Sequence, residues 1–162
     1  MARTRTGTLL MDFPAEPLAA VAVEPVIVSA LGIAVREAYR GSDLVYVTDS
    51  AQAIREMDPD FGVLSGLDVR GIVVTAESDT EGIDFVSRWF GARAGVAEDP
   101  VTGSAHCALA PYWAHRLGRN TLIARQLSGR GGTVECFVNG DRVYLGGSYR
   151  RYLEGIVHLD LD

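Results

Sequence analysis

A predicted helix over residues 103–117 constrains the fold most, because its apolar residues lie on almost every side of the helix axis. These residues are Ala105, Cys107, Ala108, Leu109, Ala110, Tyr112, Trp113 and Ala114. A helix that is apolar all round is buried all round, so we expect a curved sheet to wrap it. The small Ala and Cys side chains allow strands to approach closely. We also expect a local bend at Pro111, which has no N–H to donate.

The other segments predict short strands and few helices. Apolar runs and alternating patterns indicate strands over residues 8–13, 36–40, 44–48, 69–76, 84–90, 122–127, 133–138, 142–145 and 156–161. Two further helices are expected over residues 26–31 and 51–57. Because strands and helices do not alternate strictly, we predict an α+β fold: a curved mixed β-sheet, or half-barrel, round a central buried helix. No linker divides the chain, so a single domain over residues 1–162 is expected.

Composition excludes several classes of function. The chain has 21 acidic and 15 basic residues, a net charge of −6, so we expect it to bind neither nucleic acid nor an anionic membrane. All basic residues are arginine, which excludes Schiff-base chemistry and a Walker-type phosphate loop, because both need lysine. The two cysteines and three histidines lack ligand spacing, so no metal site is predicted. No apolar run reaches about 18 residues, so we predict a cytoplasmic protein without a membrane span.

Most of the chemical information lies in residues 98–106, which read EDPVTGSAH. Pro100 stops the central helix from extending back through Asp99, so the helix begins within Thr102–Ser104. A helix start presents unpaired N–H groups and roughly half a positive charge, and a carboxylate fits there. The expected donors to a bound anion are the N–H groups of Gly103, Ser104 and Ala105.

The sequence gives expectations for four side chains with respect to the anion site at the helix start. Asp99 is the predicted general acid or base, because the proline fixes it beside the bound anion. Arg130 is expected to be a second anchor for the carboxylate of the substrate. His106 is a candidate for contact with the ligand, and Glu98 is expected to point away.

Each of these interpretations has a structural alternative. In the alternative for the helix start, Thr102 or Ser104 only caps the helix, as such residues do in many proteins. His106 is equally well explained as a structural histidine, and Cys107 as a small core residue, because burial raises the pKa of a thiol. Residues 126–132 either reach the same cleft or form a plain glycine turn.

The sequence resembles the second half of the PhzF-like (phenazine biosynthesis) proteins. The resemblance is carried by EDPVTGSAH at 98–106 and RQLSGRGG at 125–132, with LMDFPA at 10–15 and FVSRWF at 85–90 in the same order. It implies the diaminopimelate-epimerase-like fold, in which two half-barrels each surround a helix and the active site lies between the helix starts. It also implies isomerisation of a small carboxylate, such as a dihydro-hydroxyanthranilate, by acid–base proton transfer without metal or cofactor. Asp99, Gly103 and Ser104 match functional positions of the family.

The chain departs from the family in its length. A PhzF-like protein is about twice as long, and its first half supplies a proton-shuttling glutamate and a Gly-His motif that this sequence lacks. We therefore expect an isomerase or epimerase-type domain whose cleft is completed in a homodimer or by a separate half-domain. In a two-fold dimer two Asp99 carboxylates would face each other, which favours keeping a proton on one of them. The alternatives are a non-catalytic domain that binds small anions or a partner, and a fragment of a longer enzyme.

Overall fold

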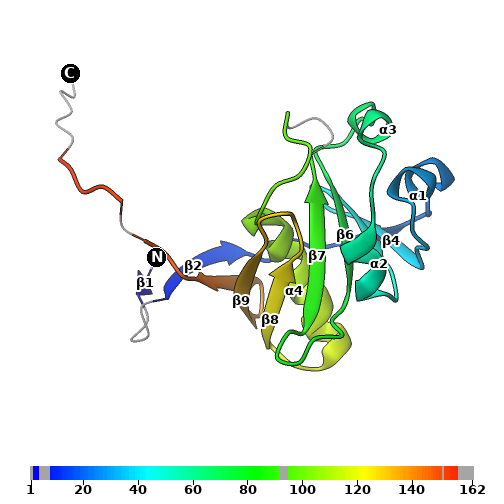
Figure 1. The fold of residues 1–162 in the computed structure, drawn as a ribbon. Coiled ribbons are helices and arrows are strands. Elements are labelled where there is room, and N and C mark those ends of the chain that lie inside the picture. The colour runs from blue at the N-terminus through cyan, green and yellow to red at the C-terminus, as the bar shows by residue number, and fades with distance from the viewer. Residues whose placement is uncertain (1, 4–7, 92–94, 151, 157–162) are drawn as a thin grey trace, which may run out of the picture.

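The computed structural model describes residues 2–3, 8–91, 95–150 and 152–156, and the strands within these ranges form one mixed sheet (Figure 1). The strand order is β1-β2-β10-β9-β8-β7-β6-β5-β4-β3. The strands are β1 (Ala2–Arg3), β2 (Leu9–Pro14), β3 (Ala19–Val21), β4 (Glu37–Arg40), β5 (Leu44–Val47), β6 (Ile72–Glu77), β7 (Phe85–Phe90), β8 (Thr121–Gln126), β9 (Gly132–Asn139) and β10 (Arg142–Gly147). The helices are α1 (Pro25–Leu31), α2 (Ala51–Glu56), α3 (Phe61–Ser65) and α4 (Gly103–Leu117). The prediction of a mixed sheet with few helices is confirmed.

Two pairs of neighbouring strands are parallel, and each pair is joined through helices. β5 runs parallel to β6, with Leu44 opposite Ile72, and α2 and α3 lie in the connection. β7 runs parallel to β8, with Phe85 opposite Ala124, and α4 lies in that connection. Because β6 and β7 are antiparallel, the chain leaves β7 at the sheet end where β5 and β6 begin. The start of α4 and the segments before β5 and β6 therefore meet at one end of the sheet.

The central strands are buried on both faces. Val45 and Val73 belong to the hydrophobic core on the face of the sheet that α4 covers. Leu44 and Ile72, one residue away in each strand, belong to the core that α1, α2 and α3 cover. This alternation follows from the two-residue period of a strand. The expectation that the run 69–76 is buried on both faces is confirmed for β6, in which residues 72–76 are all buried.

Helix α4 is buried over most of its length and contacts β8, β9 and β10. Its buried residues are Ala105, His106, Cys107, Ala108, Leu109, Ala110, Trp113 and Ala114. Tyr112 is only half-buried, and its hydroxyl donates to Glu37 Oε2 at 3.1 Å. The helix continues through Pro111. Since proline cannot donate to the carbonyl four residues earlier, the Cys107 carbonyl accepts instead from the backbone N–H of Glu16 at 3.0 Å.

Some elements differ from those predicted. β1, β3 and α3 were not expected from the sequence, and α3 begins where the Asp60 side chain accepts a hydrogen bond from the N–H of Val63 at 3.1 Å. β6 begins at Ile72 and not at residue 69, so Arg70 and Gly71 precede the strand. The strand predicted over 156–161 lies outside the described residues from 157 onward, and Ile156 is not in a strand.

Candidate functional site

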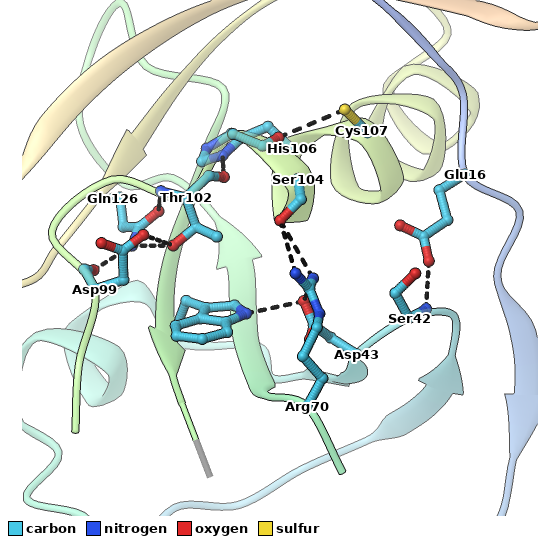
Figure 2. A network of polar contacts seen from close by, with 12 residues as sticks. Glu16, Ser42, Asp43, Arg70, Asp99, Thr102, Ser104, His106, Cys107 and Gln126 are labelled. Carbon is cyan, nitrogen blue, oxygen red and sulfur yellow. Dashed lines mark hydrogen bonds and ion pairs between the residues drawn. The ribbon is translucent and has the colours of Figure 1, made fainter. Parts of the chain in front are cut away.

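The loop before α4 is held in place by the end of β8 (Figure 2). Gln126, the fully buried last residue of β8, accepts a hydrogen bond from the N–H of Thr102 at 2.8 Å through Oε1. Its Nε2 donates to the backbone carbonyl of Asp99 at 2.6 Å. Ser128 adds a further bond from its hydroxyl to the Pro100 carbonyl at 2.8 Å. The segment 126–132 was expected either to reach the cleft or to form a turn, and these two residues support the loop that carries Asp99.

The Asp99 carboxylate lies beside the start of α4 with a fixed donor. Its Oδ2 accepts from the Thr102 hydroxyl at 2.6 Å, and that hydroxyl in turn accepts from Gln126 Nε2 at 3.2 Å. Thr102 is the N-cap residue of α4, with extended backbone angles, yet its side chain makes no hydrogen bond to the first turn. Thr102 is thus the N-cap residue, as one structural alternative expected, but its hydroxyl does not cap the helix. The first turn of α4 keeps its unpaired donors without a side-chain cap from Thr102.

The first turn of α4 also forms one wall of an open cavity of about 440 Å³. Gly103 and Ser104 are exposed, and Cys107 lies one turn further along. The opposite side of the cavity is formed by the segment 13–17, which follows from β2, and by Ser42. Ala105 is 4% exposed and does not line the cavity.

A group that sequence reasoning missed lies at the start of α4, where Arg70 connects Ser104 to Asp43 (Figure 2). Arg70 binds the Asp43 carboxylate through Nε–H to Oδ1 at 2.9 Å and Nη2–H to Oδ2 at 2.5 Å. Both terminal nitrogens also donate to Ser104 Oγ, each at 3.2 Å. Asp43 is nearly fully buried and accepts a third bond, from Trp89 Nε1 at 2.8 Å. We call these four residues the Arg70 network.

Sheet register explains why this network forms. Leu44 and Ile72 are opposite each other in the parallel pair, so the residues just before β5 and β6 are neighbours. Gly71 packs directly on the ring of Trp89, and a Cβ at position 71 would overlap that ring. The absence of a side chain at Gly71 thus allows the Arg70 guanidinium to lie over the indole, with Cζ 5.9 Å from the ring centre. The sequence shows Asp43 directly before one buried strand and Arg70 two residues before another, but it does not show that the two residues pair.

The cavity also contains a carboxylate, Glu16, which was not considered from the sequence. One carboxylate oxygen of Glu16 accepts a hydrogen bond from the N–H of Ser42. Burial, and then the charge of Glu16, raise the pKa of the Cys107 thiol. This thiol donates to the Gly103 carbonyl at 3.5 Å and is 8% exposed. The interpretation of Cys107 as a small core residue fits this environment better than a nucleophilic role.

His106 is fully buried and does not line the cavity. Its Nδ1–H donates to the Thr102 carbonyl at 2.7 Å, and its ring lies against Phe85. Burial lowers the pKa of the imidazole, so the neutral form is favoured. Its Nε2 has no hydrogen-bond partner among the described residues. This placement favours the structural alternative for His106.

Asp99 is not among the residues that line the cavity, and two other predicted residues also lie outside it. Arg130 is exposed and is not among the residues that line it. The Glu98 carboxylate forms an ion pair with Arg88, with Nε to Oε1 at 2.6 Å and Nη2 to Oε2 at 2.9 Å. Arg88 also donates to the Met57 carbonyl at 2.8 Å. Glu98 is therefore engaged in an ion pair of its own, whereas Asp99, one residue later, lies beside α4.

Metal-binding clusters and membrane-spanning helices are both absent from the described ranges. There, no group of three or more His, Cys, Asp or Glu side chains is arranged to hold a metal ion. Nor is any helix in this part of the chain long and apolar enough to cross a membrane.

Comparison with known proteins identifies relatives along almost the whole chain. The model of the family described as phenazine biosynthesis-like protein (PhzC-PhzF) matches residues 18–154. A relative in Pseudomonas aeruginosa, named as an uncharacterized isomerase, is 47% identical over 157 residues, which are 97% of this chain and 60% of the relative. Another uncharacterized isomerase, from Halalkalibacterium halodurans, is 42% identical over 139 residues, which are 83% of this chain and 52% of the relative.

Solved structures give the same result for the fold. A phenazine biosynthesis protein of the PhzF family from Enterococcus faecalis superposes with a TM-score of 0.87 at 39% identity. A PhzC/PhzF protein from Clostridium difficile gives a TM-score of 0.82 at 32% identity. In each case the match covers 96% of this chain and 60% of the other. The chain thus spans little more than half the length of the proteins that it resembles.

Proposed function

The chain belongs to the phenazine biosynthesis-like (PhzC-PhzF) family, and on this premise we propose that it is an isomerase-type domain that transfers a proton on a small carboxylate, without a cofactor. The observation that carries the proposal is the fixed position of Asp99, held by Thr102 and Gln126 beside the start of α4. Relatives named as isomerases support an enzymatic role. We further propose that the curved sheet is one half of a diaminopimelate-epimerase-like fold, with α4 at its centre.

The start of α4 is the proposed site for the substrate carboxylate. The N–H groups of Gly103, Ser104 and Ala105 lie in the first turn, which Thr102 leaves without a side-chain cap, and the helix dipole favours an anion there. The negative charge of Glu16 disfavours binding of an anion in the cavity, whereas the positive charge of the Arg70 guanidinium favours it. Asp99 then acts as the general acid or base on a carbon next to the bound carboxylate, and Arg130 is proposed to approach the carboxylate when the cleft closes.

A second wall is needed to close this site. The chain covers 60% of the relative from Pseudomonas aeruginosa and of the structure from Enterococcus faecalis. We propose that the wall is supplied by a second copy of the chain, or by a separate polypeptide equivalent to the other part of these relatives. In a symmetric dimer the start of one α4 would face its copy, so each substrate would contact both chains.

A second candidate function is a non-catalytic domain that binds small anions or a partner protein. It is favoured by two observations: Asp99 does not line the cavity, and its carboxylate is already hydrogen-bonded to Thr102. The two functions share the anion site and differ in proton transfer.

Calorimetry with benzoate, together with proton NMR of a dihydro-hydroxyanthranilate in D₂O, tests the proposal. We expect the parent chain to bind benzoate and to exchange a carbon-bound proton of the dihydro compound for deuterium. Asp99→Asn keeps the shape of the side chain, so it should retain benzoate binding and lose the exchange. Ser104→Ala should weaken benzoate binding by about 0.5–1.5 kcal/mol, the usual contribution of one hydrogen bond.

The possible results separate the two functions. Benzoate binding without exchange, in the parent and in Asp99→Asn alike, supports the non-catalytic domain. If the parent does not bind benzoate, and Ser104→Ala changes only thermal stability, then the proposed anion site is wrong.

A further inference from the structure

We propose that Arg70 is a positioning residue, which orients the hydroxyl of Ser104 so that its proton points to the carboxylate of the substrate. The inference rests on the proposed function, because it assigns a role at the same anion site. It adds two residues, Arg70 and Asp43, that precede neighbouring strands and lie far from the 98–106 segment in sequence.

The geometry of the guanidinium carries the first step. One edge of Arg70, formed by Nε and Nη2, binds both oxygens of Asp43. The end formed by Nη1 and Nη2 faces Ser104 Oγ, at 3.2 Å from each nitrogen. These contacts use four of the five N–H groups that an arginine has. The guanidinium group is planar. Once the Asp43 carboxylate holds its Nε and Nη2 atoms, the direction of the Nη1 and Nη2 atoms toward Ser104 is fixed as well.

The contacts of the Ser104 hydroxyl decide where its proton points. A serine oxygen has two lone pairs and one proton. Arg70 donates to Ser104 Oγ from two nitrogens, so both lone pairs are engaged. The structure gives this hydroxyl no hydrogen-bond acceptor among the described residues, and Ser104 is exposed on the cavity. The proton is therefore left for an acceptor in the cavity, and a carboxylate is such an acceptor.

Burial explains why the arrangement is rigid. The Asp43 side chain is 5% exposed and accepts bonds from Arg70 and from Trp89 Nε1, so its charge is fully paired. The Trp89 ring lies under the guanidinium and against Gly71. Arg70 itself keeps 44% of its side chain exposed. Its positive charge stands beside a helix start, which has the same sign of partial charge, and an anion between them relieves that repulsion.

The test combines benzoate calorimetry with a double-mutant cycle. Arg70→Gln should raise the Kd for benzoate about tenfold, and Arg70→Lys, which keeps the charge without the fork, about threefold. In the Ser104→Ala background, Arg70→Gln should raise the Kd only about twofold, because its effect passes through the hydroxyl. Arg36→Gln is the matched control: it removes another exposed arginine that is paired with an aspartate, Asp49, and the Kd should not change.

A second measurement tests the contact between Arg70 and the side chain at position 104 without any ligand. Ser104→Cys introduces a thiol whose alkylation rate against pH gives its pKa. The thiols of Cys107 and Cys136 have pKa values raised by burial and react slowly. If Arg70 donates to the side chain at position 104, Arg70→Gln in this background should raise the pKa of the new thiol by at least half a unit, whereas Arg36→Gln should not.

The outcomes distinguish this inference from the proposed function. If the parent binds benzoate, but Arg70→Gln changes neither the Kd nor the thiol pKa more than Arg36→Gln does, the positioning role is wrong and the anion site stands. Equal effects of Arg70→Gln with and without Ser104 also overturn it. If the thiol responds to Arg70 but the parent binds no benzoate, the anion site is wrong, and the role in substrate binding fails with it.

Discussion

Single polar groups at the start of α4 are held in one orientation by chains of hydrogen bonds. The Thr102 hydroxyl is an example, since it accepts from Gln126 and donates to Asp99. Each group in such a chain fixes the direction of the next, so the Asp99 carboxylate and the Ser104 hydroxyl are oriented before the proposed substrate binds. Packing holds two further residues in place: Gly71 lies against the Trp89 ring, and the His106 ring is buried against Phe85.

Gly71→Ala should destabilise the protein by about 1–3 kcal/mol, because the added methyl group overlaps the Trp89 ring and forces the ring or the strand to shift. The shift should also disturb Arg70. Urea unfolding followed by tryptophan fluorescence measures the change in the free energy of unfolding. Gly129→Ala is the control, since nothing lies within 4 Å of its Cβ, and it should change that free energy by less than about 0.5 kcal/mol. Equal effects at both positions would mean that the contact with the ring does not matter.

His106 should make stability fall in mild acid. Burial lowers its pKa in the folded state below the value of 6.5 of a free imidazole, so below about pH 6.5 the unfolded chain binds a proton that the folded chain does not. The loss reaches at most about 1.4 kcal/mol per pH unit and stops below the folded pKa. Urea unfolding at pH 7.5 and 5.5 should show a smaller pH dependence in His106→Asn than in the parent. If His106→Asn keeps the full parental pH dependence, His106 is not its source.

The residues of the site were predictable to different degrees. Asp99, Gly103 and Ser104 are consecutive or nearly so, and a proline and a helix start suffice to place them together. Arg70 and Asp43 are 27 positions apart and meet only because β5 and β6 pair in parallel with a particular register. Register depends on packing across the whole sheet, so no local pattern predicts that pair.

At the scale of elements, Pro111 shows how a helix and a strand end are connected. The missing N–H of Pro111 leaves the Cys107 carbonyl free, and the N–H of Glu16 donates to it. The segment 13–17 is thereby joined to the middle of α4 and forms the opposite wall of the cavity.

Pro111→Ala should loosen this wall, because the new N–H competes for the Cys107 carbonyl. We expect amide hydrogen exchange at Glu16 to become at least tenfold faster, while the helical circular dichroism signal stays the same or increases. Exchange measured by NMR at Asp60, whose N–H donates to the Ala30 carbonyl away from α4, serves as the internal control. An unchanged exchange rate at Glu16 would show that the proline has no part in holding the segment.

The elements themselves were mostly predictable. Strong apolar patterns gave β5 to β10 and α4, whose bounds over 103–117 agree with the prediction. β3 was missed because Ala19–Val21 is three residues long and largely exposed, so it has no periodic pattern. The start of β6 was misplaced because residues 69–71 are also compatible with a strand, and the contact of Gly71 with Trp89 is not visible in the sequence.

At the scale of the whole molecule, the property to be predicted is the oligomeric state of the chain. The chain carries a net charge of −6 and spans little more than half the length of its relatives. Among the residues beyond β10, Tyr152, Leu153 and Ile156 are more than 80% exposed. The proposed site also needs a second wall, which another copy of the chain would supply.

We therefore predict a homodimer with an interface above about 1,000 Å² in total. Light scattering coupled to size-exclusion chromatography at micromolar concentration should give twice the mass of the chain. Analytical ultracentrifugation across a concentration series then measures the dissociation constant. A sharp monomer peak at these concentrations contradicts the prediction and leaves a separate half-domain as the source of the second wall.

The Arg70 network has a further consequence, for cooperativity. Its four residues stand at positions 43, 70, 89 and 104, so it closes only after three strands and α4 have assembled. No single segment of the chain can form part of this network alone, because its four residues come from four separate segments. A ligand held there therefore stabilises the whole domain, by about 2.7 kcal/mol at a concentration of a hundred times its Kd. Ligand occupancy should then slow amide exchange wherever exchange requires unfolding of the whole domain, including in strands far from the cavity.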